Sequence, residues 1–232
     1  MKFSIPPLHG KLIKRYKRFL ADVQLDSGAL ITAHCPNSGA MLGVSDPGSS
    51  VYVTPHPDDG KRKLLYTLEC VKADGVWVGV NTFRPNTLVE EAIVNGTIKE
   101  LQGYTSIRRE VRYGVNSRID LLLTDVSKPD CYVEIKNAHL KREQYVQFPD
   151  SVTARGAKHL NELSMMVKSG ARAVVVYVAQ RSDVSQFSVA SDIDPVYAKS
   201  EQEARNIGVE FLCYGCCITR EEIVIDRSIK VF

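Results

Sequence analysis

Alternation of apolar and charged residues predicts two neighbouring strands in the middle of the chain. Residues 117–123 and 131–136 both show this period of two, which is typical of strands with one buried face. The polar break between them, residues 124–130, contains one proline and two aspartates and predicts a hairpin loop. In such an antiparallel hairpin Asp120 would lie opposite Glu134, with Lys136 two residues further along the same face.

The N-terminal third of the chain has a different pattern, of short strands separated by turn sequences rich in Gly, Pro, Asn and Asp. The predicted strands are residues 18–25, 29–35, 50–54, 64–73 and 76–80. Five short strands without helical periodicity predict a small β-barrel such as an OB-fold. Many OB-folds bind nucleic acids, although a fold alone does not set a function.

Helical periodicity begins after residue 82. Asn86 is expected to cap a helix that Gly96 interrupts. Later segments predict alternating strands and helices: strand 105–113, helix 152–168, strand 172–179, helix 195–206, and strands 209–213 and 223–225. The sequence therefore predicts a two-domain α+β or α/β protein. Residues 1–82 would form the OB-fold-like barrel, and residues 83–232 a mixed sheet flanked by helices.

Composition places the chain among ordinary globular proteins. It has 232 residues, of which 44% are hydrophobic and 25% charged. No apolar run approaches the roughly 18 to 20 residues that span a bilayer, and the first residues do not resemble a secretory signal. We therefore expect a cytoplasmic protein with no membrane partner. The sequence does not define the oligomeric state, and a homodimer is compatible with it.

Basic residues are concentrated near the N-terminus. Residues 1–84 contain 11 Lys and Arg against 7 Asp and Glu. Much of the excess lies at Arg15, Lys17 and Arg18, which flank or follow Tyr16. Such a run can neutralise backbone phosphates while an aromatic ring stacks on a base, which predicts nucleic-acid contacts at these four residues. An edge strand protected by its charges explains the run equally well.

Two further features have ordinary explanations that we favour. The six cysteines are scattered through predicted strands, and the cluster Cys213, Cys216 and Cys217 lacks the second pair that a zinc site needs. We expect structural thiols. The loop 34–39 could present backbone N–H groups to an anion, but a tight turn accounts for its Pro, Asn and Gly residues.

The central hairpin offers a candidate metal site. Two opposed carboxylates, Asp120 and Glu134, repel each other unless a cation lies between them, and Mg²⁺ or Mn²⁺ would suit these oxygen ligands. Glu110 on the preceding strand could complete the metal shell, and an ion-paired position on a charged strand face explains this residue equally well. Lys136 would help to activate water, so Asp120, Glu134 and Lys136 are the candidate catalytic residues. The ordinary alternative is a solvated strand face with a Glu–Lys pair.

Other basic residues near the hairpin are candidate phosphate contacts. Arg118 stands two residues before Asp120, and Arg155 and Lys158 share one turn of the helix predicted at 152–168. His159 lies in the same helical turn, where a solvated position is the favoured interpretation.

These motifs resemble those of a known family. Asp120 followed by Glu134-Ile135-Lys136 resembles the PD-(D/E)XK nuclease-like superfamily, with Ile119 where a proline is usual. The whole chain resembles the sugar fermentation stimulation protein family, SfsA, through residues 15–19, 34–39, 117–120, 133–137 and 148–152. The resemblance implies an OB-like N-terminal domain, a PD-(D/E)XK-like C-terminal domain and DNA binding without strong sequence preference. It also implies a role in regulating sugar metabolism, notably that of maltose.

Three functional hypotheses follow from these residues and from what the resemblance implies. The leading one is a DNA-binding protein with a Mg²⁺- or Mn²⁺-dependent nuclease site at Asp120, Glu134 and Lys136. The second is a non-catalytic DNA-binding regulator of sugar metabolism that uses the nuclease fold as a scaffold. The third is an enzyme that uses the same carboxylates on RNA or a small molecule.

Overall fold

The N-terminal part of the chain forms a small closed barrel. The computed structural model describes residues 1–232, and its first sheet contains β1 (Leu8–Tyr16), β2 (Leu20–Leu25), β3 (Leu30–His34), β4 (Ser50–Pro55), β5 (Tyr66–Ala73) and β6 (Val76–Gly79). Strands β1 to β5 close on themselves because β3 pairs with both β2 and β5. Strand β6 extends this sheet beyond β5. The prediction of an OB-fold-like barrel is confirmed.

Apolar residues at alternate strand positions fill the barrel. Leu12, Val23 and Val53 are among the side chains that are almost completely buried there. The first hairpin turns through the three residues 17–19 between the paired Tyr16 and Leu20, and Lys17 and Arg18 both have positive φ (48° and 64°). The basic run is therefore divided between strand β1 and an exposed turn.

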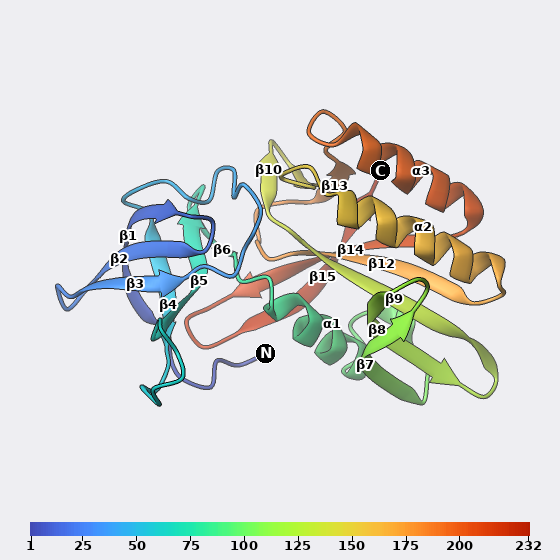
Figure 1. Cartoon of the computed structure of the whole chain (residues 1–232), viewed down its shortest axis with the longest axis horizontal. Coiled ribbons are helices and arrows are strands. Elements are labelled where there is room, and N and C mark those ends of the chain that lie inside the picture. Colours follow the sequence, from blue (N-terminus) through green and yellow to red (C-terminus); the bar gives the residue numbers. More distant parts are fainter.

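The remainder of the chain forms a second, larger sheet with helices on both faces. Its elements are α1 (Arg84–Val94), a short 3-10 helix (Lys99–Leu101), β7 (Ser106–Tyr113), β8 (Ser117–Asp125), β9 (Lys128–Ala138), β10 (Leu140–Arg142), β11 (Tyr145–Phe148), α2 (Ala154–Lys168), β12 (Arg172–Ala179), β13 (Gln186–Val189), α3 (Pro195–Ile207), β14 (Glu210–Ile218) and β15 (Ile223–Val231). The nine strands follow the order β10-β11-β13-β15-β14-β12-β9-β8-β7. Helices α2 and α3 cover one face and α1 the other (Figure 1).

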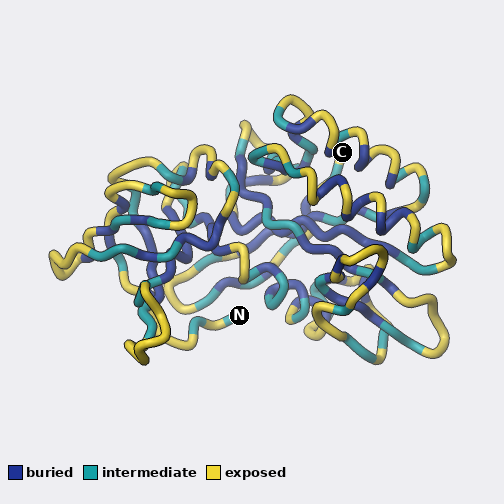
Figure 2. Tube along the Cα trace, in the orientation of Figure 1, coloured by how far each residue is buried: buried dark blue, intermediate teal, exposed yellow.

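Each face of the large sheet has its own hydrophobic core. Side chains of α1 pack against the residues of the central strands that point to one face of the sheet. Side chains of α2 and α3 pack against the residues that point to the other face. Strand β12 is buried along nearly its whole length because helices lie on both sides of it. Buried positions follow the barrel interior and these central strands, while the loops and outer helix faces are exposed (Figure 2). The predicted mixed sheet flanked by helices is confirmed, and none of its helices is long and apolar enough to cross a membrane.

Three local predictions were wrong. Helix α1 begins at Arg84 with Pro85 in its first turn, so Asn86 lies inside the helix rather than capping it. The predicted seven-residue hairpin loop is only the turn Val126–Ser127 between β8 and β9, because Asp125 Oδ1 accepts the Ser127 N–H and closes the turn locally. Strands β10, β11 and β13 were missed because segments of three or four residues are too short for a periodic signal.

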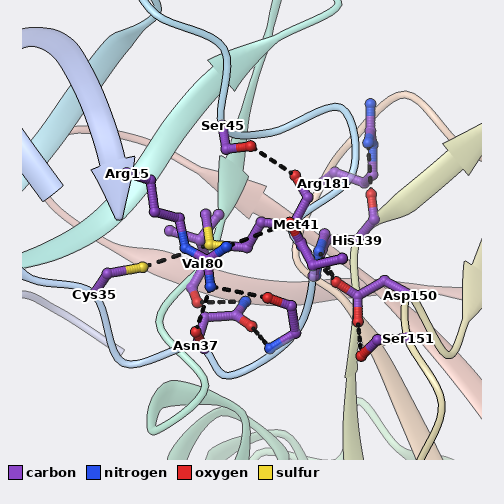
Figure 3. Close-up of polar contacts among 12 residues, drawn as sticks. Arg15, Cys35, Asn37, Met41, Ser45, Val80, His139, Asp150, Ser151 and Arg181 are labelled. Carbon is purple, nitrogen blue, oxygen red and sulfur yellow. Dashed lines mark hydrogen bonds and ion pairs between the residues drawn. The ribbon is translucent and has the colours of Figure 1, made fainter. Parts of the chain in front are cut away.

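The two sheets meet at a buried polar joint. The carboxylate of Asp150, which precedes α2, accepts the Met41 N–H at 2.8 Å and lies directly against Gly39 (Figure 3). Arg15 holds the same loop from the barrel side, donating at 2.9 Å to the carbonyls of Asn37 and Gly39. The loop 34–39 therefore meets a carboxylate of the same chain.

Arg181 provides a second connection across the joint. It is 1% exposed, and its guanidinium contacts Asp74 of the barrel at 2.9 Å and Asp183 of the large sheet at 2.7 Å. It also donates to the main-chain carbonyl of His139 at 2.8 Å. Because a buried guanidinium is costly unless its donors are satisfied, these bonds fix how the two sheets sit together.

The first residues of the chain lie on the second sheet. The Met1 ammonium contacts the Ile223 carbonyl and the Glu91 carboxylate, both at 2.6 Å. The main chain of Lys2 forms an isolated antiparallel β-bridge with that of Glu222. The division into residues 1–82 and 83–232 stays a prediction.

Gly39→Ala should weaken the joint. A Cβ at this position would lie 2.4 Å from Asp150 Oδ1, so we expect a loss of about 1–3 kcal/mol in the free energy of unfolding. Denaturant titration would measure it, with Ser38→Ala at the exposed neighbouring position as the control. Equal stability of the two variants would show that the loop does not press on Asp150.

Candidate metal and phosphate site

The candidate site lies where strands β8 and β9 part. Their pairing includes Leu121 with Val133, and the same register one residue further places Asp120 opposite Glu134, as predicted. At this point the Ile135 N–H donates to Asp120 Oδ2 at 2.7 Å. The Asp120 carboxylate, rather than a main-chain carbonyl of β8, therefore accepts this N–H, and both acids lie where the β8–β9 ladder is interrupted.

Glu134 is buried with one oxygen satisfied and one not. It is 3% exposed, and its Oε1 accepts from Lys136 Nζ at 2.6 Å and from His159 Nδ1 at 2.5 Å. Arg155 Nε contacts His159 Nε2 at 3.3 Å, and because arginine can only donate, the ring proton must lie on Nδ1. Glu134 Oε2 is buried and has no hydrogen-bond partner.

The two carboxylates differ in their protonation. Burial and the neighbouring charge of Glu134 raise the pKa of Asp120 to about 6, against the hydrogen bonds from Ile135 N–H and Asn86 Nδ2. Burial also opposes ionisation of Glu134, but Lys136 and His159 outweigh it and hold its pKa below the usual value. Glu134 is thus the charged member of the pair, and Asp120 takes up a proton near pH 6.

Helix α2 and strand β7 supply two further groups that the sequence analysis missed. Glu162 is 2% exposed, with Oε1 accepting from Val115 N–H at 3.2 Å and Oε2 unpartnered. The Tyr113 hydroxyl is also buried and unpartnered, and burial, followed by the charges of Glu134 and Glu162, raises its pKa. Arg155, His159 and Glu162 stand at helical spacing i, i+4 and i+7, a signal that could have indicated one functional face.

The structure corrects two expectations around this pair. His159 is buried against Glu134, so the favoured solvated position was wrong. Glu110 lies beside Asp120 in the register but is exposed, has φ of 53° and makes no hydrogen bond or ion pair. No group of three His, Cys, Asp or Glu side chains is close enough to hold a metal ion, so Glu110 is not brought into the shell.

The donors that remain fit a hard divalent cation. Asp120 and Glu134 supply carboxylate oxygens only, and an unpartnered buried oxygen points to a missing cationic neighbour. Mg²⁺ and Ca²⁺ accept a few carboxylates with waters completing the shell. The thiols are elsewhere: Cys213 and Cys216 are buried within β14.

Only some of the predicted nucleic-acid contacts surround this site. Arg118, Arg155 and Lys158 are exposed near it, and Lys158 also donates to the Val115 carbonyl at 3.2 Å. The other four lie on the barrel, where Lys17 and Arg18 are exposed in the first turn. Arg15 and Tyr16 have structural partners instead, namely the loop carbonyls for the guanidinium, and Asp22 for the tyrosine hydroxyl.

Comparison with known proteins identifies the family. A family model described as the N-terminal OB domain of SfsA matches residues 13–80, and one described as the sugar fermentation stimulation protein RE domain matches residues 83–222. The chain belongs to the sugar fermentation stimulation protein family. This assignment agrees with the resemblance found in the sequence motifs.

SfsA relatives match over the full length of the chain. The sugar fermentation stimulation protein homolog of Paramagnetospirillum magneticum is 53% identical, with 100% of this chain and 98% of the relative covered. The homolog of Rhodospirillum centenum is 52% identical, covering 100% and 99%. The solved structure of Pyrococcus furiosus SfsA in complex with Ca²⁺ is 28% identical and superposes with a TM-score of 0.90 over 100% of this chain and 98% of that one.

Removal of the His159 ring should destabilise the buried Glu134 carboxylate. In His159→Ala the Glu134 carboxylate keeps Lys136 as its only hydrogen-bond partner. We therefore expect a loss of about 1–3 kcal/mol in the free energy of unfolding. Asn161→Ala, at an exposed position of the same helix, is the matched control for denaturant titration. A variant as stable as the control would mean that the contact with Glu134 contributes nothing.

Calcium affinity should follow the protonation of Asp120. Its pKa of about 6 means that metal and proton compete below that pH, so the dissociation constant should fall about tenfold per pH unit up to about pH 6 and level off above about pH 7. Isothermal titration calorimetry would test this, with Asp130→Asn, an exposed aspartate, as the control. Constant affinity of the parent between about pH 5 and 7 would contradict Asp120 as a ligand.

Proposed function

We propose that the protein binds DNA without strong sequence preference and hydrolyses its phosphodiester bonds with a divalent metal, Mg²⁺ or Mn²⁺, held by Asp120 and Glu134. The observation that carries the proposal is the unpartnered Oε2 of Glu134 beside the carboxylate of Asp120, with the Lys136 ammonium 2.6 Å from the other oxygen. The Ca²⁺ complex of the related Pyrococcus furiosus protein supports a divalent ion in this family.

Each residue around the pair has a distinct task. A divalent cation bound there would polarise a phosphodiester oxygen and lower the pKa of a bound water. Lys136, only 15% exposed, is positioned by Glu134 to orient an attacking water and to stabilise the charge that grows on the phosphate oxygens. His159 fixes the orientation of Glu134, and Asn86 fixes that of Asp120 by donating to Oδ1 at 3.0 Å.

The barrel would add contacts to the DNA backbone. Lys17 and Arg18 project from an exposed turn, and phosphate contacts of this kind carry no sequence information. Affinity would fall as salt rises, because cations are released from the phosphates on binding. We propose that the protein acts in this way in the cytoplasm.

The alternative is a non-catalytic DNA-binding regulator of sugar metabolism, including that of maltose. The exposed basic residues would serve it equally well, but it gives no task to the buried carboxylate pair. The two functions separate in a cleavage experiment.

Loss of Lys136 should reduce cleavage without abolishing DNA binding. Supercoiled, linear and single-stranded DNA would be incubated with the parent, Glu134→Gln and Lys136→Ala in the presence of Mg²⁺ or Mn²⁺. We expect Lys136→Ala to lose about 10²-fold or more in rate, because it removes a charge that acts in the transition state. Glu134→Gln should lose cleavage altogether.

Two exposed residues provide controls for this experiment. Glu143→Gln and Lys230→Ala make the same chemical changes at surface positions away from the carboxylates, and both should cut as the parent does. If every protein shifts the DNA in a gel and none cuts it, the nuclease proposal fails and the non-catalytic regulator is favoured.

A further inference from the structure

The tip of the β7–β8 hairpin, residues 112–118, carries two arginines that face each other. Arg112 and Arg118 are direct partners in the antiparallel ladder, so their side chains leave the same face of the hairpin. Both are exposed, and neither guanidinium makes an ion pair or hydrogen bond within the protein. Like charges directly opposite each other are destabilising in a sheet, and an anion between them would remove that cost.

The hairpin tip forms an open hollow that could receive such an anion. A hollow of 470 Å³ is lined by Arg112, Tyr113, Gly114, Asn116, Ser117 and Arg118. Gly114 and Asn116 both have positive φ (54° and 61°), so the main chain turns sharply around this hollow. The volume suits a phosphate together with part of its sugar.

Helix α2 holds the tip in place. Glu162 Oε1 accepts the Val115 N–H at 3.2 Å, and Lys158 Nζ donates to the Val115 carbonyl at 3.2 Å. The helix also approaches the turn closely, because a Cβ on Gly114 would lie 3.1 Å from Glu162 Cδ. The two arginines therefore flank an anchored turn. Because the main chain there is already fixed, less conformational entropy would be lost when a ligand binds.

The hollow adjoins the carboxylate site. Tyr113 lines it, and the buried hydroxyl of the same residue lies among Glu134, Glu162 and Asp120, whose charges raise its pKa after burial has done so. Arg118 stands two residues before Asp120 on β8, a Cα separation of about 7 Å.

We infer that Arg112 and Arg118 together bind one backbone phosphate of a DNA strand, the one adjacent to the phosphodiester at Asp120 and Glu134. The inference rests on the proposed function and adds to it a defined position for the strand. Arg109 is excluded from this task because it is ion-paired with Glu90 of α1. Arg108 is exposed and unpaired on the same strand but lies outside the hollow, which makes it a matched control.

The salt dependence of DNA binding tests the inference without requiring cleavage. Fluorescence anisotropy with a short labelled duplex of mixed sequence, in Ca²⁺, would give the slope of log affinity against log salt for the parent, Arg112→Ala, Arg118→Ala, the double variant and Arg108→Ala. The double variant should lower the magnitude of the slope by about 1, because the one phosphate that both arginines hold is lost. Each single variant should weaken binding and lower the slope by less than the double variant does, because the remaining arginine still contacts that phosphate.

Other outcomes would overturn the inference. A loss of about 2 in the double variant would mean two independent contacts, and an equal loss in Arg108→Ala would mean a general effect of surface charge. A parent that binds DNA, with arginine variants of unchanged slope, would remove the subsite and leave the proposed function intact. A parent that does not bind DNA would remove both. Unfolding midpoints equal to that of the parent would establish that the variants are folded.

Discussion

The burial of two carboxylates at the parting of β8 and β9 is the constraint on which the functional half of the molecule depends. An ionised carboxylate in this position is costly unless cations and donors surround it. The surrounding elements supply them: Lys136 from the same strand, His159 from α2 and Asn86 from α1. Two helices on opposite faces of the sheet thus reach one opening, and their packing is tied to the electrostatics of the site. One oxygen of the pair, Glu134 Oε2, remains buried without a hydrogen-bond partner.

The joint between the sheets extends this dependence to the barrel. Asp150 accepts the Met41 N–H from the barrel loop, and the α2 N-cap, Thr153, follows it after two residues. Thr153 is fixed in turn by the carboxylate of Asp194, which accepts its N–H at 2.7 Å and also caps α3. The start of α2, and with it His159 one to two turns later, is held by groups from three parts of the chain. A shift of the barrel loop would therefore be transmitted to the helix that orients Glu134.

The sequence was sufficient where a rule links position to geometry. Antiparallel pairing keeps a constant sum of residue numbers between irregularities, and beyond the register shift between Leu123 and Asp125 this sum places Asp120 opposite Glu134, as predicted. It was insufficient where a side chain chooses between solvent and a distant partner. His159 and Arg15 resemble solvated basic residues, yet one is buried on Glu134 and the other binds loop carbonyls. Glu110 has the right register, but its positive φ and exposure take it away from the pair.

The distribution of unpaired positive charge indicates which sheet would dominate the proposed contact with DNA. The net charge is only +3, so overall attraction is weak and local clusters must provide most of the binding. In the basic N-terminal run, the Arg15 guanidinium is already bound to loop carbonyls, which leaves Lys17 and Arg18 at one turn. Around the carboxylates, by contrast, Arg112 and Arg118 have no protein partner at all. For the proposed binding of DNA, the large sheet is therefore better equipped than the barrel to hold a phosphate backbone, and the barrel would contribute chiefly by fixing α2.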